Sequence, residues 1–212
     1  MTKRRWIAVF TALGILIAAA LTTAAVTRGS SSEDDSPLLA APTSTSQIIT
    51  TTLPRSTTTA LLPHPLPAPS DPYAPTPIVQ VGTVEIPSIG LVHPVFEGIT
   101  LTVIDHGPGH WPGSAMPCQR GNSVFPGHRV THTHPFLNLD LVHPGDQIIF
   151  RLPGRECVYS VTGTQIVSPT DLWVTDPTPT PTVTLIACHP KHSAAQRIVV
   201  KGKLIADIPT KA

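Results

Sequence analysis

The stretch TVTLIAC, residues 182–188, is a continuous apolar and β-branched run with turn-forming residues before and after it. This composition is typical of a strand buried in a sheet. Because side chains alternate along a strand, Cys188 lies on the more polar face, opposite the apolar residues Val183, Leu185 and Ala187. The run therefore predicts a strand that ends in a partly accessible thiol.

The last apolar run of the chain, RIVVKGKLI at residues 197–205, predicts a second strand after a short connection. Alternation leaves Arg197 on the face away from the core, opposite the apolar face of Ile198, Val200 and Leu204. If the two strands pair, the guanidinium of Arg197 reaches the mouth of the cysteine site. A planar cation with several donors there can hold a carbonyl oxygen or a peptide backbone.

Upstream of these strands, short β-rich runs recur between Gly and Pro residues, and no run of ten or more residues has a convincing helical period. The pattern predicts an all-β domain over residues 78–212, a small antiparallel barrel or sandwich. Single helical turns are expected at residues 101–105 and 135–141. The other expected strands are residues 81–86, 91–96, 122–125, 147–152 and 157–167.

The first 28 residues have the pattern of a membrane anchor. Lys3, Arg4 and Arg5 precede an uncharged stretch over residues 6–26, and about 20 apolar residues span a bilayer core of roughly 30 Å. The basic flank predicts a cytoplasmic N-terminus and an extracytoplasmic body, in a single-pass protein of the cell membrane. The alternative is a cleaved signal peptide, for which residues 18–20, Ala-Ala-Ala, offer a cleavage site.

Residues 29–77 are rich in Pro, Ser, Thr and Ala and predict a disordered linker with extended geometry, a semi-rigid stalk between anchor and domain. The whole chain has 25 prolines in 212 residues, which disfavours one compact fold for all of it. The formal net charge is +1, so we expect no nucleic-acid partner.

A cysteine nucleophile needs a neighbouring group that keeps it as thiolate and moves a proton, and histidine is suited to that task. Among ten histidines, His128 is the best placed, because it follows the expected strand 122–125 and a glycine, Gly127, that allows close backbone approach. For any one of these residues alone, a packing role in a β domain is the simpler reading.

Together, several motifs resemble the class E sortases of actinobacteria, in which Cys-His-Pro follows the catalytic strand. The resemblance runs in order from about residue 81 to residue 205. It is carried by GPGHWPG at 107–113, GN at 121–122 with GHR at 127–129, PGD at 144–146, SPTD at 168–171, and TLIACHP at 184–190 ending with QR at 196–197.

This resemblance implies an eight-stranded β-barrel that joins exported proteins to the cell wall. Cys188 would attack the carbonyl after threonine in a C-terminal Leu-Pro-x-Thr-Gly or Leu-Ala-x-Thr-Gly sorting signal. His128 would protonate the departing glycine amine and then deprotonate the amine of a peptidoglycan precursor. Arg197 would position the signal and stabilise the oxyanion. The implied partners are signal-bearing exported proteins and that amine.

Four further residues are expected to contact the substrate: Ile186, Ala187, Arg129 and Trp173. Two positions depart from the family's pattern. Ala187 stands where a threonine usually precedes the cysteine, so no hydroxyl is available there. Pro126 stands where an alanine usually precedes the Gly-His pair, and a proline removes a backbone donor and fixes the approach to His128.

Cys118 and Cys157 are left over, and in an exported protein two further thiols favour a disulfide. The alternative is two unrelated buried thiols, because spacing alone does not show whether their Cα atoms come within about 7 Å. We expect no cofactor and no metal ion. Zinc ligation remains the alternative for the strings Cys188-His189-x-x-His192 and His128, His132, His134.

Two other function classes stay open at the level of sequence. One is a different exported cell-wall cysteine enzyme, such as an L,D-transpeptidase, although the Ile-Ala-Cys-His stretch at 186–189 lacks the Ser-His-Gly-Cys type of motif expected there. The other is a non-catalytic surface domain on a stalk, which would tolerate alanine at Cys188 without loss of function.

Overall fold

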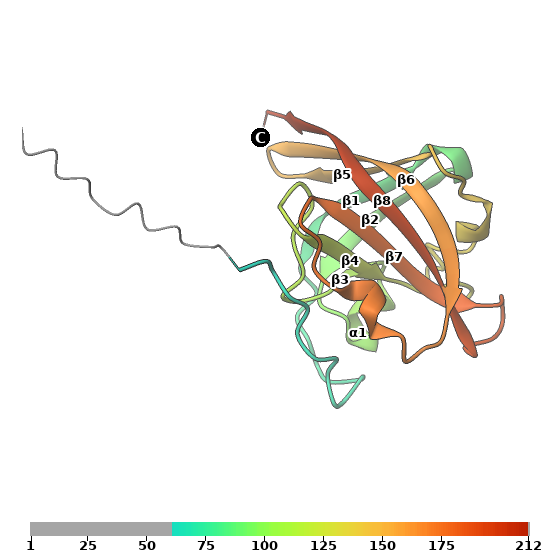
Figure 1. Ribbon diagram of the computed structural model, residues 1–212. Helices are drawn as coiled ribbons and strands as arrows, with labels where there is room; N and C mark the ends of the chain where they lie inside the picture. The colour runs from blue at the N-terminus through green and yellow to red at the C-terminus, as the bar shows by residue number, and fades with distance from the viewer. Residues whose placement is uncertain (1–60, 212) are drawn as a thin grey trace, which may run out of the picture. The chain divides into compact units, whose positions relative to one another are not determined.

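The computed structural model describes residues 61–211, and eight strands of that part form one sheet in the order β3-β2-β1-β5-β6-β8-β7-β4 (Figure 1). The ends of this sheet meet, because Trp111 N beside β3 donates to Val124 O of β4 at 2.8 Å. The result is a nearly closed barrel. Its strands are β1 (Gln80–Ile86), β2 (Leu91–Glu97), β3 (Gly109–His110), β4 (Asn122–Pro126), β5 (Gln147–Leu152), β6 (Arg155–Val167), β7 (Thr182–His189) and β8 (Gln196–Pro209).

Every run predicted as a strand is a strand in this barrel. The two-residue β3 was not predicted, because two residues are too short to show a period. The expectation of a wholly antiparallel barrel is wrong, since β2 pairs with β3 and β4 pairs with β7 in parallel. Strand order along the chain does not reveal which strands become neighbours after a long connection, and these parallel pairs join segments separated by loops.

Short helical segments lie in the connections between strands. The predicted turns are confirmed as α1 (Leu101–Ile104) and η2 (Leu139–Leu141), the latter shorter than expected. Two further 3₁₀ segments, η1 (Pro87–Ile89) and η3 (Leu172–Thr175), were not predicted. A single turn of helix carries too few residues for a hydrophobic period, so only turn composition marks it.

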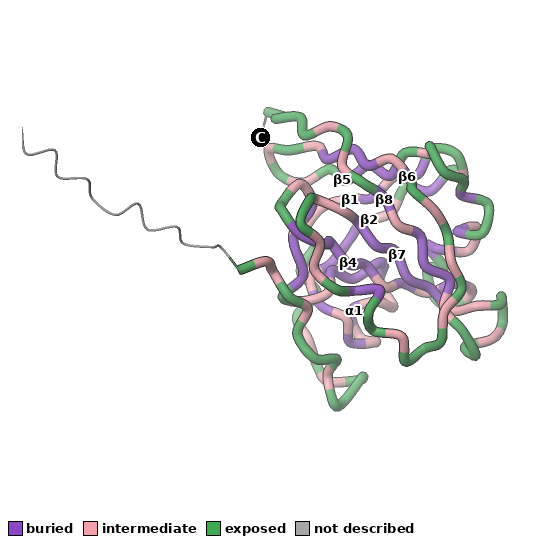
Figure 2. The backbone as a smooth tube through the Cα atoms, viewed as in Figure 1, coloured by how far each residue is buried: buried purple, intermediate pink, exposed green. Residues whose placement is uncertain are grey.

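The barrel core follows the predicted alternation, and buried residues gather in the strands at the centre of the domain (Figure 2). Leu185 and Ala187 of β7 pack with Ile198 and Val200 of β8 in this core. The outer face of the same strands is also covered. Ile186 and Val199 pack there with Val124 and with Val174 of η3, so the connection from β6 to β7 lies over this part of the barrel wall.

The last part of the predicted linker packs against the barrel. We call residues 64–76 the N-terminal strap. Leu66 N donates to Pro112 O at 2.8 Å, Trp111 Nε1 donates to Leu66 O at 2.8 Å, and Leu101 N donates to Pro72 O at 2.7 Å. The strap therefore shares hydrogen bonds with the domain, so residues that precede the predicted boundary at residue 77 already contact the barrel.

The predicted membrane anchor lies outside the described residues, as does most of the predicted linker. Among residues 61–211, no helix has the length and apolar character needed to cross a bilayer.

A disulfide joins Cys118 and Cys157, whose Cα atoms are 5.5 Å apart. Cys118 lies in the loop before β4, and its backbone N–H donates to the Tyr159 hydroxyl at 2.8 Å. The pairing that the sequence left open is thus formed. It leaves Cys188 as the free cysteine, and all three cysteines of the chain lie within the described residues.

Candidate active site

Cys188 is the penultimate residue of β7 and lies directly opposite Arg197 of β8. Directly opposed residues of an antiparallel pair point to the same face, with Cβ atoms about 4.5–5.5 Å apart. The thiol is partly exposed, whereas its neighbour Ala187 is 2% exposed and faces the core. Strand alternation thus places the side chains of Cys188 and Arg197 on the same outward face of the barrel.

His128 reaches the same region from β4. The parallel pairing of β4 with β7 sets Pro126 beside Ile186, and Gly127 N donates to Ile186 O at 2.9 Å. A Cβ atom on Gly127 would lie 2.8 Å from the Phe136 ring, so glycine is required for this close approach. The predicted role of Gly127 is confirmed.

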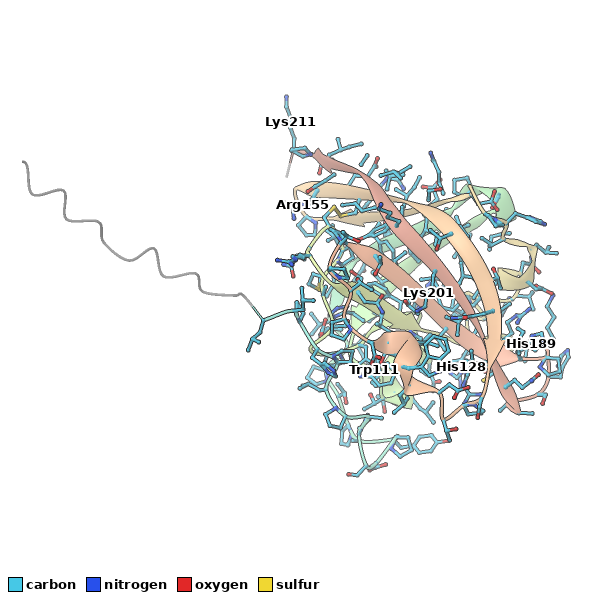
Figure 3. All side chains as sticks on the ribbon, viewed as in Figure 1. Trp111, His128, Arg155, His189, Lys201 and Lys211 are labelled. Atoms are coloured by element: carbon cyan, nitrogen blue, oxygen red, sulfur yellow. A yellow bond between two sulfur atoms is a disulfide. The ribbon has the colours of Figure 1, made fainter. Side chains whose placement is uncertain are left out.

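His128 and Cys188 line one cavity of about 350 Å³, which we call the cysteine cavity. Thr131, His192 and Ser193 contribute to its other walls, so the loops after β4 and β7 enclose it. His128 and His189 lie toward one end of the barrel, far from Arg155 and Lys211 at the other end (Figure 3).

An acidic residue that sequence reasoning missed holds the imidazole. Asp105, the residue after α1, places Oδ1 2.7 Å from His128 Nε2. This contact favours the tautomer that carries a proton on Nε2 and leaves Nδ1 for exchange with a substrate. Only the fold brings the two residues together, since they are 23 positions apart and no local motif links them.

His132 joins the same carboxylate. Its Nδ1 lies 3.3 Å from Asp105 Oδ1, and its ring stacks on that of His128 with centroids 4.7 Å apart and an interplanar angle of 27°. His132 has a positive φ of 52°, an uncommon conformation for a residue with a side chain. Asp105, His128 and His132 each offer one ligand atom within 4.8 Å of the others, whereas His134 is not part of this cluster.

Arg129 lines the cysteine cavity, but protein groups already engage its guanidinium. The residue is 2% exposed, its Nε donates to Leu137 O at 2.9 Å and its Nη1 donates to Cys188 O at 3.3 Å. Its Nη2 also lies 2.8 Å from Asp140 Oδ1. Because the guanidinium is bonded to protein groups on several sides, Arg129 fixes the backbone of Cys188, and its contact with substrate stays a prediction.

The Asp140 carboxyl has a pKa below its ordinary value of 3.8. Partial burial acts to raise the pKa, but a backbone hydrogen bond and the cations Arg129 and Lys191 outweigh it. Asp140 therefore remains ionised beside Arg129 at neutral pH and anchors the guanidinium.

Arg197 lines a second, neighbouring cavity of about 250 Å³, which we call the arginine groove. Its walls are mostly apolar and come from the strap, β4, η3 and β7, through Ala68, Trp111, Pro126, Leu172 and Ile186. Arg197 Nη1 donates to Ala194 O and Gln196 O, both at 2.9 Å, which leaves donors on its other nitrogens. The predicted substrate residue Ile186 thus lines this groove, two residues before Cys188 on β7.

Two other predicted substrate residues lie elsewhere. The side chain of Ala187 faces the barrel core because it alternates with Cys188 along β7. Trp173 is 51% exposed, and Lys201 Nζ lies 5.4 Å from its ring centroid. Its neighbours Leu172 and Val174 line the arginine groove, whereas Trp173 is in the wall of neither cavity described here. Within a single helical turn, sequence does not show which side chain faces inward.

The sortase domain family matches residues 84–205 of this chain, more than half of its length. Sortase SrtE1 of Streptomyces coelicolor is 32% identical over 140 residues, which are 58% of this chain and 40% of that protein. Sortase D of Bacillus subtilis is 30% identical over 128 residues, which are 58% of this chain and 63% of that protein. The matches thus span less than two thirds of either relative.

Solved structures agree with these sequence matches. The crystal structure of sortase E1 from Streptomyces coelicolor, with a tripeptide in its active site, has a TM-score of 0.58 and 28% identity, covering 62% of this chain and 91% of that one. Sortase E from Streptomyces avermitilis has a TM-score of 0.58 and 29% identity over the same shares, 62% and 91%. The resemblance to class E sortases is confirmed.

Proposed function

Because this chain belongs to the sortase family, we propose that it is a cysteine transpeptidase that cleaves a C-terminal Leu-Pro-x-Thr-Gly or Leu-Ala-x-Thr-Gly signal and joins the carrier protein to a cell-wall amine. The observation that supports the proposal is that a free thiol, Cys188, and an imidazole, His128, line one cavity, with Arg197 directly opposite Cys188 on β8. These groups are the nucleophile, the proton carrier and the anion-stabilising cation that the reaction requires.

In the proposed first step, the Cys188 thiolate attacks the carbonyl carbon of the signal threonine and forms a tetrahedral oxyanion. Arg197, on the same face as Cys188, stabilises the negative charge. Collapse breaks the Thr–Gly bond, and the His128 imidazolium gives its proton to the leaving glycine amine. A thioester between Cys188 and the threonine remains.

In the second step, His128 takes a proton from the incoming amine, which attacks the thioester and expels the Cys188 thiolate. The chain thereby exchanges one amide for another without a net change in bond type. Asp105 serves as a positioning residue, because its contact with Nε2 holds the imidazole with Nδ1 free. The loops around the cysteine cavity line the space in which the amine must reach the thioester ahead of water, which would hydrolyse it.

The arginine groove is the proposed binding site for the extended signal peptide. Its apolar walls suit the leucine and proline, or alanine, that begin the signal, and its end at Arg197 adjoins Cys188. Ala68 of the strap forms one wall, so a segment expected to be linker contributes to the site.

We further propose that residues 1–28 anchor the protein in the cell membrane with the N-terminus in the cytoplasm, and that residues from 29 up to the strap span the gap to the catalytic domain. The uncharged stretch 6–26 behind a basic tip supports the anchor. The Cys118–Cys157 bond supports an exported domain, because disulfides persist in oxidising compartments.

The experiment that tests the function uses the full-length chain with a fluorogenic sorting-signal peptide and an amine acceptor. We expect cleavage between Thr and Gly, and Cys188→Ala is expected to lower turnover by at least about a hundredfold with an unchanged melting curve. The trapped acyl-peptide should map to Cys188 by mass spectrometry. Near-normal turnover in the variant, or an adduct on Cys118 or Cys157, would remove Cys188 from the reaction. The alternatives, an L,D-transpeptidase or a non-catalytic domain, are not favoured by the family match.

A further inference from the structure

Two histidine rings face a single carboxylate oxygen in the cluster around Asp105, although one imidazole would be enough to satisfy that oxygen. His128 Nε2 and His132 Nδ1 both converge on the same oxygen, Asp105 Oδ1, at 2.7 and 3.3 Å. One carboxylate oxygen thus serves two imidazoles. When the nitrogens that face Asp105 lose their protons, each offers a lone pair toward the same small volume.

We propose that Asp105, His128 and His132 form a binding site for a divalent ion of the zinc class, and that the bound ion switches the transpeptidase off. The inhibition rests on the proposed function, because that function assigns the proton transfer to His128. Zinc binding itself depends only on the three side chains and is independent of the reaction.

The donor set selects the ion. Two imidazole nitrogens and one carboxylate oxygen suit Zn²⁺, and also Co²⁺, Ni²⁺ or Cu²⁺, whereas Ca²⁺ and Mg²⁺ prefer oxygen ligands throughout. Tetrahedral zinc with bonds of about 2.1 Å keeps its ligand atoms roughly 3.4 Å apart. The two contacts to Asp105 at 2.7 and 3.3 Å therefore need only small expansions to admit an ion.

The surroundings allow this adjustment and supply a remaining ligand. The His132 side chain is 50% exposed, so it can rotate at the loop surface, while the His128 side chain is 15% exposed and is held by the barrel. The cysteine cavity next to His128 admits water for the open coordination position. His132 also keeps a left-handed backbone conformation with φ of 52°, and non-glycine residues held in such conformations gather at functional sites.

Binding at His128 Nε2 has a direct consequence for the chemistry. An imidazole that coordinates a metal through one nitrogen carries at most one proton, on the other nitrogen. It is then no longer the imidazolium acid that the leaving glycine amine needs. The bound ion therefore excludes the doubly protonated form of His128 that catalysis requires, and zinc acts as a reversible inhibitor.

The test measures zinc binding directly, by calorimetric titration of ZnSO₄ into the chelator-treated full-length chain. We expect one ion per chain, no binding of Ca²⁺, and a loss of zinc affinity of at least about tenfold in His132→Asn and in Asp105→Asn. Asparagine is chosen at His132 because it tolerates a positive φ. The matched control is His134→Asn, an exposed loop histidine that also has a positive φ, of 37°, but lies outside the cluster, and it should bind zinc as the wild type does.

Inhibition of peptide cleavage provides the second readout. Zinc should inhibit the wild type and His134→Asn, and the turnover that His132→Asn retains should have lost most of the zinc sensitivity. Circular dichroism checks that each variant is folded.

Co²⁺ reports on the ligands themselves. A thiolate-to-cobalt charge-transfer band that disappears in Cys188→Ala would assign the ion to the cysteine and overturn the proposal. Equal zinc affinity in the wild type, His132→Asn and Asp105→Asn would overturn it as well. A wild-type chain that binds zinc at this cluster but cleaves no signal peptide would preserve the site and reject the proposed function.

Discussion

At the scale of single residues, Asp105 has the least expected role. We predict that Asp105→Asn lowers kcat for signal-peptide cleavage by roughly tenfold to a hundredfold, because the charge that favours the Nε2–H tautomer of His128 is removed. KM should change little, since Asp105 does not line the arginine groove, the proposed binding site for the signal peptide. The measurement is steady-state kinetics together with ¹⁵N NMR of the His128 ring, which shows the nitrogen that carries the proton.

Asp207→Asn is the matched control for this prediction. Asp207 pairs with Arg155 at the end of the barrel away from His128 (Figure 3) and is exposed, so its loss should leave kcat unchanged. If Asp105→Asn left both kcat and the tautomer of His128 as they are in the wild type, Asp105 would have no positioning role.

At the scale of structural elements, Arg129 links the loop after β4, η2 and the end of β7. We predict that Arg129→Met lowers the free energy of unfolding by about 2 kcal/mol or more, because the carbonyls of Leu137 and Cys188 lose their buried donor. Urea unfolding at neutral pH measures this change. Arg120→Met, at an exposed guanidinium bonded to Pro179 O, is the control and should cost much less.

The ion pair between Arg129 and Asp140 predicts that stability depends on pH. The Asp140 pKa in the folded protein lies below 3.8, so its stabilising contribution is complete above that value and is lost as the pH falls through the lowered folded pKa. The difference in unfolding free energy between the wild type and Asp140→Asn should therefore shrink as the pH falls below about 4. A difference that stayed constant down to strongly acidic pH would show that Asp140 is not the titrating partner.

The N-terminal strap is held by a hydrogen bond that a conservative change removes. We predict that Trp111→Phe raises KM for the signal peptide by about fivefold with little change in kcat, because the Nε1–H bond to Leu66 O is lost and the Ala68 wall loosens. Trp173→Phe is the control, since Trp173 packs against Lys201 outside the groove. A rise in KM for Trp173→Phe and none for Trp111→Phe would restore the substrate contact that the sequence alone suggested.

At the scale of the whole molecule, the disulfide is the clearest covalent constraint. It joins residues 39 positions apart, across the loop before β4 and the start of β6. We predict that the double variant Cys118→Ser, Cys157→Ser loses roughly 2 to 4 kcal/mol of unfolding free energy while it keeps turnover at low temperature, because Cys188 is not part of the bond. Thermal unfolding with and without reductant should show the same loss in the wild type. A fall in turnover without a fall in stability would place the disulfide in the reaction instead.

Local pattern was sufficient for much of this molecule. All the strands except β3 follow from runs of apolar residues and their alternation, and that alternation also placed Cys188 and Arg197 on an outward face. Close approach at Gly127 likewise follows from the absence of a side chain. Each of these features depends on residues that are near in the chain, and a sequence records such neighbours directly.

Contacts between segments that are distant in the chain could not be predicted from the local sequence pattern. The Asp105–His128 bond, the parallel pairing of β4 with β7, the burial of Arg129 and the strap wall at Ala68 each join segments brought together by the barrel. The net free energy of such a contact depends on which surfaces are buried against each other and removed from water. That pairing of surfaces is decided only when the barrel forms. Residue chemistry thus follows from the chain, while the pairing of those residues into a working site follows from the closed barrel.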